Sequence, residues 1–251
     1  MIRYHGTPIT PEAAAIHILK GRHGLISFAN PKQVSLAAEV CQSFVLDNGA
    51  FTAWKSGVNP DWDEFEKWVK HWIYHPGFDW FLIPDVIDGE EKENIDLIND
   101  FVKRFPNHKN RMVPVWHLHE SLTHLKGLSF MFDRIAIGSS GEFAKLKTQK
   151  WEERMEQVFE TLCDDSGRPR VRVHGLRMMD PTIFSRFPFA SVDSCNVARN
   201  IGIDKAWDSF KYGGDLTRGT RGVIMADRCE FHASATVFTK SKEKQFRFLF
   251  G

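Results

Sequence analysis

Eight short apolar runs recur through residues 1–200, and each is followed by a polar or glycine-rich turn and then by a helix-like segment. The runs are rich in β-branched and other large apolar residues, which is typical of strands buried on both faces. Strands that alternate with helices pair in parallel through right-handed crossovers, so the pattern predicts an α/β fold. The predicted strands cover residues 2–5, 25–28, 44–46, 80–83, 112–115, 134–137, 171–173 and 190–192.

Eight strand–helix units are the number that closes a (β/α)8 barrel, and 251 residues is the usual length of one such domain. We therefore predict a TIM barrel over residues 1–212. A doubly wound open sheet is the structural alternative, because it uses the same alternation of elements. Residues 213–251 break the pattern and predict a short irregular C-terminal extension, Gly-rich and then basic, that packs on the barrel.

Several local signals place the helices. Thr10 before Pro11 predicts a helix start, with Thr10 as the N-cap and Pro11 in the first helical position. Residues 61–75 carry four aromatic side chains at helical spacing, so we expect these rings to pack against the barrel. The four are Trp62, Phe65, Trp68 and Trp72. A further helix is predicted over 197–210, and residues 223–226 and 231–238 are candidate strands.

Charge and cysteine usage exclude several classes of protein. The 33 Lys and Arg residues balance 32 Asp and Glu residues, and the net charge of +1 excludes a uniformly basic, histone-like protein. No apolar run is long enough for a membrane span or a signal peptide, so we expect a cytoplasmic protein without membrane contact. The four cysteines show no CxxC spacing, so neither a disulfide framework nor a clustered zinc site is expected.

Polar side chains stand where the predicted strands end. Catalytic residues of a TIM barrel lie at the carboxyl ends of its strands, so we expect Asp47, Asp85 and Asp193 to face one pocket. Three carboxylates in one pocket raise one another's pKa, and this suits acid–base chemistry or a hydrogen-donating ligand. Further ionisable residues at predicted strand ends are His5, His117, His119, Glu142 and His174.

Paired carboxylates on either side of an anomeric carbon can carry out glycosyl transfer. One attacks or stabilises the oxocarbenium-like centre, and the other moves protons on the leaving group. A third carboxylate can accept hydrogen bonds from an N–H edge, such as N1–H and the 2-amino group of guanine. Backbone N–H groups in the Gly-Ser-Ser-Gly turn at 138–141 can donate to a carbonyl oxygen.

Metal-dependent hydrolysis is the competing chemistry. His117 and His119, together with the aspartates, are residue types that bind divalent ions. Alternate residues of a strand point to opposite faces, so these two histidines could ligate one ion only from a loop. We therefore expect neither a metal nor another cofactor. A metal-dependent hydrolase of a small molecule remains an alternative function.

Six strand-end segments follow one another in a characteristic order. They are LDNGAF at 46–51, IPD at 83–85, VPVWH at 113–117, AIGSSGE at 136–142, HGL at 174–176 and VDSCNVAR at 192–199. In this order they resemble the motifs of the tRNA-guanine transglycosylase family, which are (β/α)8 enzymes that exchange guanine for a 7-deazaguanine base. The resemblance covers roughly residues 43–200.

The resemblance implies roles for individual residues. Asp193 corresponds to the nucleophile that forms a covalent glycosyl intermediate, and Asp47 corresponds to the general acid–base residue. Asp85 corresponds to the residue that reads the N1/N2 edge of the base. His117 stands where the family has a base-contacting Gln. Gly138, Ser139 and Ser140 correspond to the segment that caps the carbonyl oxygen, and Phe51 or Trp116 could stack on the base or pack in the core.

The departures from the family concern its zinc subdomain. Nothing after Asp193 matches the Cys-x-Cys-x-x-Cys run, because Cys195 and Cys229 stand alone, and the chain is much shorter than the tRNA enzymes. The sequence is more similar to the short, zinc-free DNA-guanine transglycosylases of bacteriophages and bacterial modification islands. The resemblance implies DNA as the partner, with tRNA less expected, and a free base such as 7-cyano-7-deazaguanine. It also implies a helper protein and, for a phage-encoded enzyme, the host cytoplasm.

Nucleic-acid contacts are expected in the C-terminal part of the chain. We place them at Asn196, Arg199, Arg218 and Arg221, with further basic residues at Lys205, Lys211, Arg228 and 240–248. The near-zero net charge means that any such footprint is local and salt-sensitive. An ordinary solvated surface is the structural alternative. An RNA-acting enzyme of the same type and a non-catalytic nucleic-acid-binding barrel are the functional ones.

Overall fold

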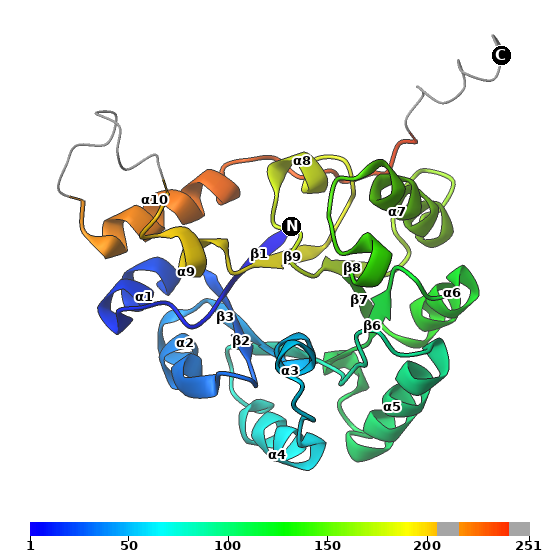
Figure 1. Ribbon diagram of the computed structural model, residues 1–251, viewed down its shortest axis with the longest axis horizontal. Coiled ribbons are helices and arrows are strands. Elements are labelled where there is room, and N and C mark those ends of the chain that lie inside the picture. The colour runs from blue at the N-terminus through cyan, green and yellow to red at the C-terminus, as the bar shows by residue number, and fades with distance from the viewer. Residues whose placement is uncertain (205–215, 241–251) are drawn as a thin grey trace, which may run out of the picture.

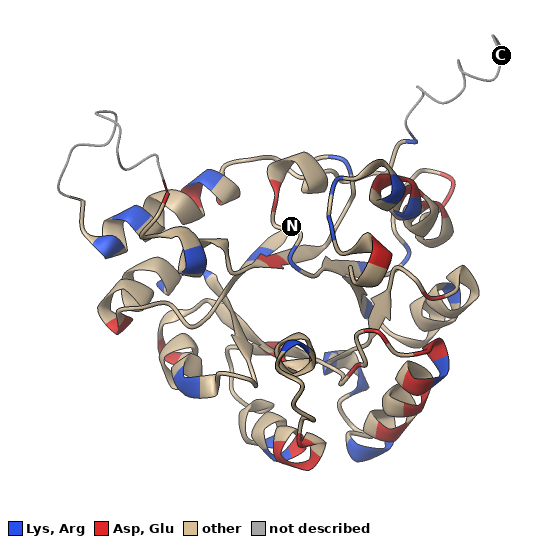
Figure 2. Ribbon diagram, in the orientation of Figure 1, with Lys and Arg blue, Asp and Glu red and all other residues tan. Residues whose placement is uncertain are grey.

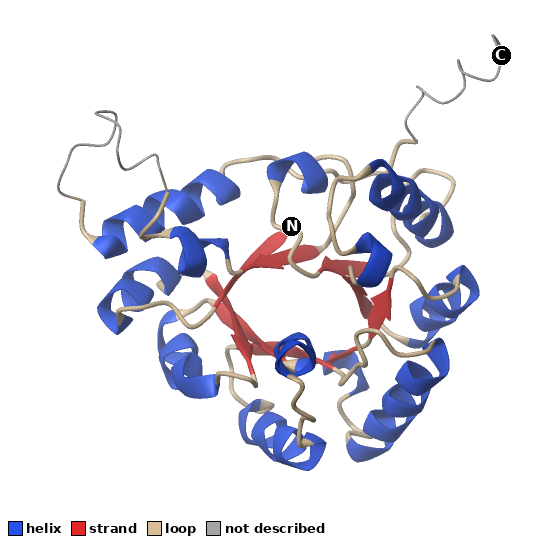
Figure 3. Ribbon diagram, viewed as in Figure 1, coloured by secondary structure: helices blue, strands red, loops and turns tan. Residues whose placement is uncertain are grey.

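The computed structural model describes residues 1–204 and 216–240, and it shows a ring of strands inside a ring of helices (Figures 1 and 3). All strand pairs of the sheet are parallel. The α/β barrel expected from the sequence is therefore confirmed. The strands are β1 Ile2–Gly6, β2 His23–Ser27, β3 Ser43–Asp47, β4 Phe78–Leu82, β5 Met112–Val113, β6 Val115–His117, β7 Arg134–Gly138, β8 Arg172–Gly175 and β9 Ser191–Ser194.

Pro114 explains why nine strands form an eight-stranded barrel. The strand order is β5-β4-β3-β2-β1-β9-β8-β7-β6, so β5 and β6 stand at its two ends. They are halves of one extended segment that is interrupted at Pro114, which has no N–H for the ladder. The Pro114 carbonyl still accepts a hydrogen bond from the Ala136 amide at 2.9 Å. The sheet therefore closes through this segment, and an open doubly wound sheet is excluded.

The helices lie between the strands as expected, with a few differences. They are α1 Glu12–Leu19, α2 Val34–Val40, α3 Ala50–Ser56, α4 Trp62–Trp72, α5 Glu91–Arg104, α6 Leu122–Met131, α7 Gln149–Leu162, α8 Pro181–Phe184, α9 Asn196–Asn200 and α10 Arg218–Glu230, with 3-10 turns η1 Pro31–Gln33, η2 Lys109–Arg111 and η3 Gly141–Phe143. Helix α3 was not predicted. The predicted cap at Thr10 is wrong, because Pro11 occupies the N-cap of α1 and makes no side-chain cap. Of the helix predicted over 197–210, residues 205–210 lie outside the described residues.

The strands predicted at 223–226 and 231–238 are also wrong. Residues 223–226 belong to α10, which Thr217 caps by accepting a hydrogen bond from the Thr220 amide at 3.1 Å. The buried residues Gly222, Met225 and Ala226 recur at helical spacing, and they face α1 and α9. Val223 and Ile224, which suggested a strand, lie at the flanks of this contact. Tertiary packing therefore overrides their local β-preference.

The two-residue side-chain period of the strands decides what enters the barrel. Tyr4, Val45 and Val115 belong to the cluster that fills the interior. Asp47 and His117 follow Val45 and Val115 by two residues, so the strands place both side chains on the same inner face. His5, by contrast, points outward. The aromatic rings of α4 pack as expected, since Phe65 contacts Phe28, Phe81 and Phe101, Trp68 contacts Phe28 and Trp72 contacts Phe44.

Among the described helices, none combines the length and apolar character that crossing a bilayer requires.

The contact between α10 and α1 generates a stability prediction from two glycines of the same helix. A Cβ at Gly222 would lie 2.2 Å from Ile18 Cδ1, whereas a Cβ at Gly219 would meet its nearest neighbour, His17, at 3.4 Å. We expect Gly222→Ala to lower the free energy of unfolding by about 1–2 kcal/mol because of overpacking. Gly219→Ala should be neutral or raise it by up to about 1 kcal/mol, because alanine favours the helix. Urea unfolding followed by circular dichroism measures both, and equal effects would contradict the described packing.

Candidate active site

A cavity of about 410 Å³ opens at the carboxyl ends of the strands. It brings together every residue that the sequence analysis assigned to catalysis or base binding, namely Asp47, Phe51, Asp85, His117, Gly138, Ser139, Ser140 and Asp193. These residues come from five different strand ends and from α3. A second cavity of about 550 Å³ lies on the outside of the barrel, between α7 and residues 237–239, and contains none of them. The cavity at the strand ends is therefore the candidate active site.

Asp193 near the end of β9 has one carboxylate oxygen that faces two nitrogen atoms. Its Oδ1 accepts a hydrogen bond from the Arg177 amide at 2.8 Å and lies 3.3 Å from His174 Nε2. The residue is buried, with 4% of its surface exposed. Among the described residues, no group donates a hydrogen bond to the other oxygen, Oδ2. That oxygen is therefore the one available to a ligand in the cavity.

Asp47 is the last residue of β3 and carries the most perturbed carboxyl of the site. Burial, together with the negative charges of Asp193 and Asp85, raises the pKa of Asp47 to about 6. The Gly49 amide donates to its Oδ2 at 3.2 Å and opposes this rise. Gly49 has φ +78°, and a Cβ there would lie 2.8 Å from the Ala29 amide nitrogen, so the turn requires glycine. Asp47 can therefore exchange a proton near neutral pH.

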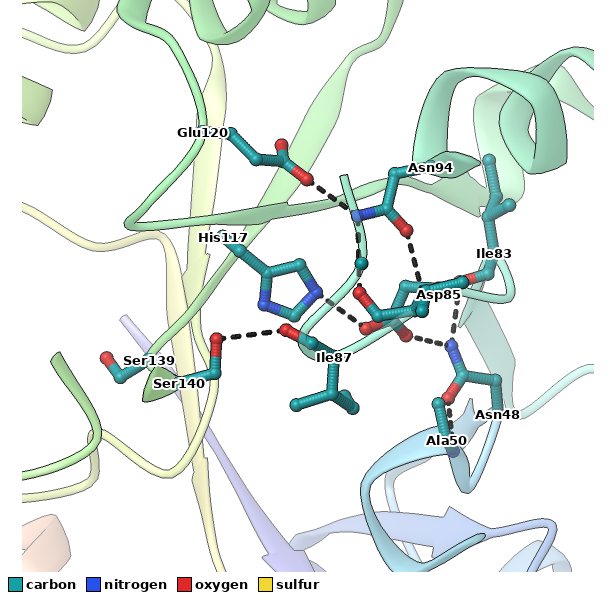
Figure 4. Close-up of polar contacts among 12 residues, drawn as sticks. Asn48, Ala50, Ile83, Asp85, Ile87, Asn94, His117, Glu120, Ser139 and Ser140 are labelled. Atoms are coloured by element: carbon teal, nitrogen blue, oxygen red, sulfur yellow. Dashed lines mark hydrogen bonds and ion pairs between the residues drawn. The ribbon is translucent and has the colours of Figure 1, made fainter. Parts of the chain in front are cut away.

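Asp85 is held by two side chains (Figure 4). Asn48 Nδ2 donates to its Oδ1 at 2.7 Å, and His117 Nε2 lies 2.8 Å from its Oδ2. Burial lowers the pKa of His117, but the hydrogen bond and charge of Asp85, with smaller contributions from Glu120 and Asp88, raise it overall. The two partners fix the plane of the Asp85 carboxylate, while each oxygen keeps a second lone pair for a ligand.

A second layer of polar groups fixes the loop that carries Asp85. Asn94 on α5 accepts a hydrogen bond from the Val86 amide at 2.7 Å and donates to the Val86 carbonyl at 3.3 Å. It also donates to Glu120 Oε1 at 2.6 Å (Figure 4). The other oxygen of Glu120 lies 3.2 Å from His124 Nδ1. The sequence reasoning missed Asn48, Asn94 and Glu120. Only Asn48 carried a signal, because it lies inside the LDNGAF segment.

The Gly-Ser-Ser turn after β7 lines the cavity beside the loop that carries Asp85. Ser139 Oγ accepts a hydrogen bond from Trp151 Nε1 at 3.0 Å, and Ser140 Oγ donates to the Ile87 carbonyl at 3.1 Å. Both hydroxyls therefore serve to shape the turn. A Cβ at Gly138 would lie 2.8 Å from Nδ1 of His117, so glycine leaves room for this ring.

Arg177 is a cavity residue that the sequence reasoning missed. Its guanidinium lies 4.2 Å above the centre of the Phe51 ring and donates to the Ser139 carbonyl at 2.7 Å. Its backbone has φ +59°, and its amide is the one that holds Asp193. The only sequence signal was its position directly after the HGL segment. Arg177 thus links Phe51, the Ser139 turn and Asp193.

Other expected strand-end residues lie elsewhere. His5 points away from the cavity, with Nε2 2.8 Å from Glu230 Oε1 on α10. Glu142 is exposed and pairs with Lys150. His119 Nε2 lies 3.1 Å from the Gly89 carbonyl, outside the cavity lining. Trp116 is buried and donates to the Ser121 carbonyl at 3.1 Å, so Phe51 is the aromatic residue that faces the cavity.

Within the described part of the chain, no group of three or more His, Cys, Asp and Glu side chains is placed to hold a metal ion. His117 and His119 stack with ring centres 5.6 Å apart instead of converging on one point.

The expected nucleic-acid contacts fall on α9 and α10, where Figure 2 shows segments of positive charge. Arg199 on α9 lines the cavity, while Asn196 is exposed and accepts a hydrogen bond from Asn200 Nδ2 at 2.5 Å. Arg218 and Arg221 lie in the first turns of α10. The last turn of α10 pairs with Arg22, just before β2, so its first turn lies toward the opposite, carboxyl end of the barrel. Lys205, Lys211 and residues 241–248 lie outside the described residues.

Comparisons with known proteins support the fold. No family model and no curated protein matches the chain. A solved structure from Coccidioides immitis, assigned as a fructose-1,6-biphosphate aldolase, superposes with a TM-score of 0.55 and 16% identity. The match covers 92% of this chain and 87% of that chain. At this identity the likeness concerns the barrel alone.

The coupling between the carboxylates generates a testable prediction. Since the charges of Asp193 and Asp85 help to raise the pKa of Asp47, Asp193→Asn and Asp85→Asn should each lower it, and Asp193→Asn should lower it more. Carboxyl ¹³C NMR titration of the wild type should show Asp47 protonating near pH 6.

Glu142→Gln is the matched control, because Glu142 is exposed and outside the cavity lining. It should leave the titration of Asp47 unchanged. An Asp47 pKa that stays the same in Asp193→Asn would show that the two carboxylates do not share one electrostatic environment.

Proposed function

We propose that the protein is an enzyme that exchanges guanine in a nucleic acid for a free 7-deazaguanine base through a covalent Asp193–glycosyl intermediate. The observation that carries the proposal is the meeting of Asp47, Asp85 and Asp193 in one cavity, where burial and the neighbouring charges raise the pKa of Asp47. Carboxylates with different environments are the usual basis for separate acid and nucleophile roles.

In the first half-reaction, Asp193 Oδ2 attacks C1′ of the target nucleotide. The C1′–N9 bond breaks, and its electron pair stays on the guanine ring. Protonated Asp47 gives its proton to the departing base, which leaves as neutral guanine. In the second half-reaction, Asp47 takes a proton from the incoming base, whose N9 attacks C1′. The ester bond to Asp193 then breaks and its electron pair returns to the carboxylate.

Base recognition falls to the walls of the cavity. The free lone pairs of Asp85 suit the N1–H and 2-amino donors that guanine and 7-deazaguanines share. The turn at Gly138, Ser139 and Ser140 lies beside the Asp85 loop, where its backbone can face the O6 side, which adjoins N1 in the base. Phe51 offers a ring face for stacking, and Arg177 lies above that ring. His117 is supported by Asp85 and faces the same space.

DNA is the proposed polymer, as in the short, zinc-free enzymes that the sequence resembles. A target inside a duplex must be flipped out or single-stranded before C1′ can reach Asp193. Arg199 at the cavity, with Arg218 and Arg221 on α10, supplies positive charge at the same end of the barrel. The net charge of +1 requires that binding depend on such a local group.

Incubation with guanine-containing DNA or tRNA and radiolabelled guanine tests the exchange. We expect label in the DNA, a covalent adduct on denaturing gels, and loss of both in Asp193→Asn. Asp47→Asn should slow adduct formation by about 10²–10⁴-fold, because proton donation to the leaving base is lost. In the wild type, adduct formation should decline above about pH 6, where Asp47 loses its proton.

Glu142→Gln should behave as the wild type in each of these assays. Label in tRNA alone would show that RNA and not DNA is the substrate. Label in neither polymer would refute base exchange. Loss of activity on chelation would favour the metal-dependent hydrolase. Unchanged nucleic-acid binding in Asp47→Asn/Asp193→Asn, without turnover of any base, would favour a binding module.

The basic residues at the rim generate a separate prediction. Replacing Arg218 and Arg221 with Gln should weaken DNA binding and reduce the slope of log K against log salt by about 1 for each phosphate that the variant no longer neutralises. Filter binding between about 50 and 200 mM salt measures the slope. Arg172→Gln is the control, because Arg172 is exposed at the amino end of β8. Equal slopes in all three proteins would remove α10 from the binding surface.

A further inference from the structure

A chain of buried polar groups runs through the barrel beneath the proposed nucleophile. Arg134 Nη1 donates to Ser191 Oγ at 3.0 Å, and Ser191 Oγ lies 2.9 Å from His174 Nδ1. His174 Nε2 lies 3.3 Å from Asp193 Oδ1. All four residues are buried, and His174 and Ser191 have no exposed surface. None of the roles proposed above uses Arg134, Ser191 or His174.

The groups at the two ends of this chain, the Arg134 guanidinium and the Asp193 carboxylate, decide the direction of the hydrogen bonds between them. A guanidinium can only donate, so Ser191 Oγ accepts from Arg134. The single hydroxyl proton of Ser191 then has His174 Nδ1 as its acceptor. If Nδ1 carried the proton instead, it could donate to the second lone pair of Ser191 Oγ, but the hydroxyl proton would then have no acceptor among the described residues. The unprotonated Nε2 would also face the Asp193 carboxylate. The ring proton of His174 therefore sits on Nε2, the nitrogen that faces Asp193.

The ring of His174 is also held sterically. Trp80 meets it edge-on at a centroid distance of 4.8 Å, and Tyr4 does so at 6.0 Å. Tyr4 is itself fixed by a hydrogen bond to Asp79 Oδ2 at 2.5 Å. A 180° ring flip would place Cδ2 toward Ser191 and Cε1 toward Asp193 and so remove both contacts, and this packing opposes it. Burial lowers the pKa of His174, which favours a neutral ring with one proton.

We propose that His174 is a positioning residue that points Nε2–H at Oδ1 of Asp193, and that Ser191 and Arg134 set its tautomer. With the Arg177 amide on the same oxygen, the carboxylate is oriented so that Oδ2 faces the cavity. The Nε2–Oδ1 contact does not have the alignment of a hydrogen bond, and hydrogen bonds in active sites commonly tighten only in the complex with substrate. The assignment of Oδ2 as the attacking atom rests on the proposed function, whereas the tautomer does not.

The same donors serve both half-reactions. When C1′ is bound to Oδ2, Oδ1 becomes the carbonyl oxygen of the ester and still accepts from Nε2–H. When the incoming base attacks, the C1′–Oδ2 bond breaks and negative charge returns to the carboxylate. A donor already aimed at Oδ1 stabilises that charge without reorganisation. Loss of one such donor should slow the chemical step by about tenfold to a hundredfold.

Histidine ¹⁵N NMR of the intact wild-type protein tests the tautomer without any substrate. We expect the His174 resonances of a neutral ring with the proton on Nε2, assigned by their loss in His174→Gln. In Ser191→Ala this preference should weaken or reverse. A wild-type ring with its proton on Nδ1, or one doubly protonated at neutral pH, would overturn the proposal.

Adduct formation tests the positioning role. At saturating nucleic acid, Ser191→Ala should slow adduct formation about tenfold and leave the KM for the free base unchanged, while Ser191→Thr, which keeps the hydroxyl, should recover most of the rate. His174→Gln, which keeps an N–H near the Nε2 position, should retain more activity than His174→Leu. Circular dichroism melting confirms that each variant is folded.

The outcomes separate the two proposals. A tautomer change in Ser191→Ala with an unchanged rate would refute positioning while leaving base exchange intact. No adduct in the wild type would refute the proposed function, and with it the catalytic role of His174. The wild-type spectrum would still decide the direction of the hydrogen-bonded chain.

Discussion

Mutual repulsion among three carboxylates in one cavity is the constraint around which the strand ends are built. The inward side-chain positions of a closed barrel bring Asp47, Asp85 and Asp193 together, and neutral or shared donors balance their charge. Backbone amides meet Asp47 and Asp193, while Asn48 and His117 meet Asp85. Burial and the charges of Asp193 and Asp85 raise the pKa of Asp47, so this carboxyl is the one that holds a proton near neutral pH. The proposed difference between an acid and a nucleophile thus arises from burial and neighbouring charge, although the side chains are chemically identical.

Much of this arrangement could be predicted from the sequence, because strand period and strand ends are local properties. The alternation of apolar runs predicts the barrel, and Asp47, Asp85 and Asp193 lie where the runs stop. The orientation of side chains on the first strand was harder to predict from the sequence, because a position at the strand end does not say which face a side chain takes. His5 turns outward to Glu230. For the same reason, the sequence could not decide whether Phe51 or Trp116 faces the cavity.

Longer-range contacts account for what the sequence did not reveal. Helix α10 forms where its small residues meet α1, although residues 223–226 within it resemble a strand locally. Asn94 and Glu120 reach the loop of Asp85 from other elements, so no motif contains them together with it. Arg177 adopts a left-handed backbone that side-chain type alone does not indicate. These residues depend on the assembled barrel, and their roles follow only from its geometry.

The position of Arg177 also means that one face of the Phe51 ring is covered by a guanidinium of the same chain. A planar ligand that stacks on that face must either displace a guanidinium or lie against it, and the hydrogen bond to the Ser139 carbonyl resists displacement. A ligand ring therefore competes with the Arg177 guanidinium for this face of Phe51. The protein thus supplies its own partner for the Phe51 ring, and any ligand ring that uses this face shares it with a positive charge.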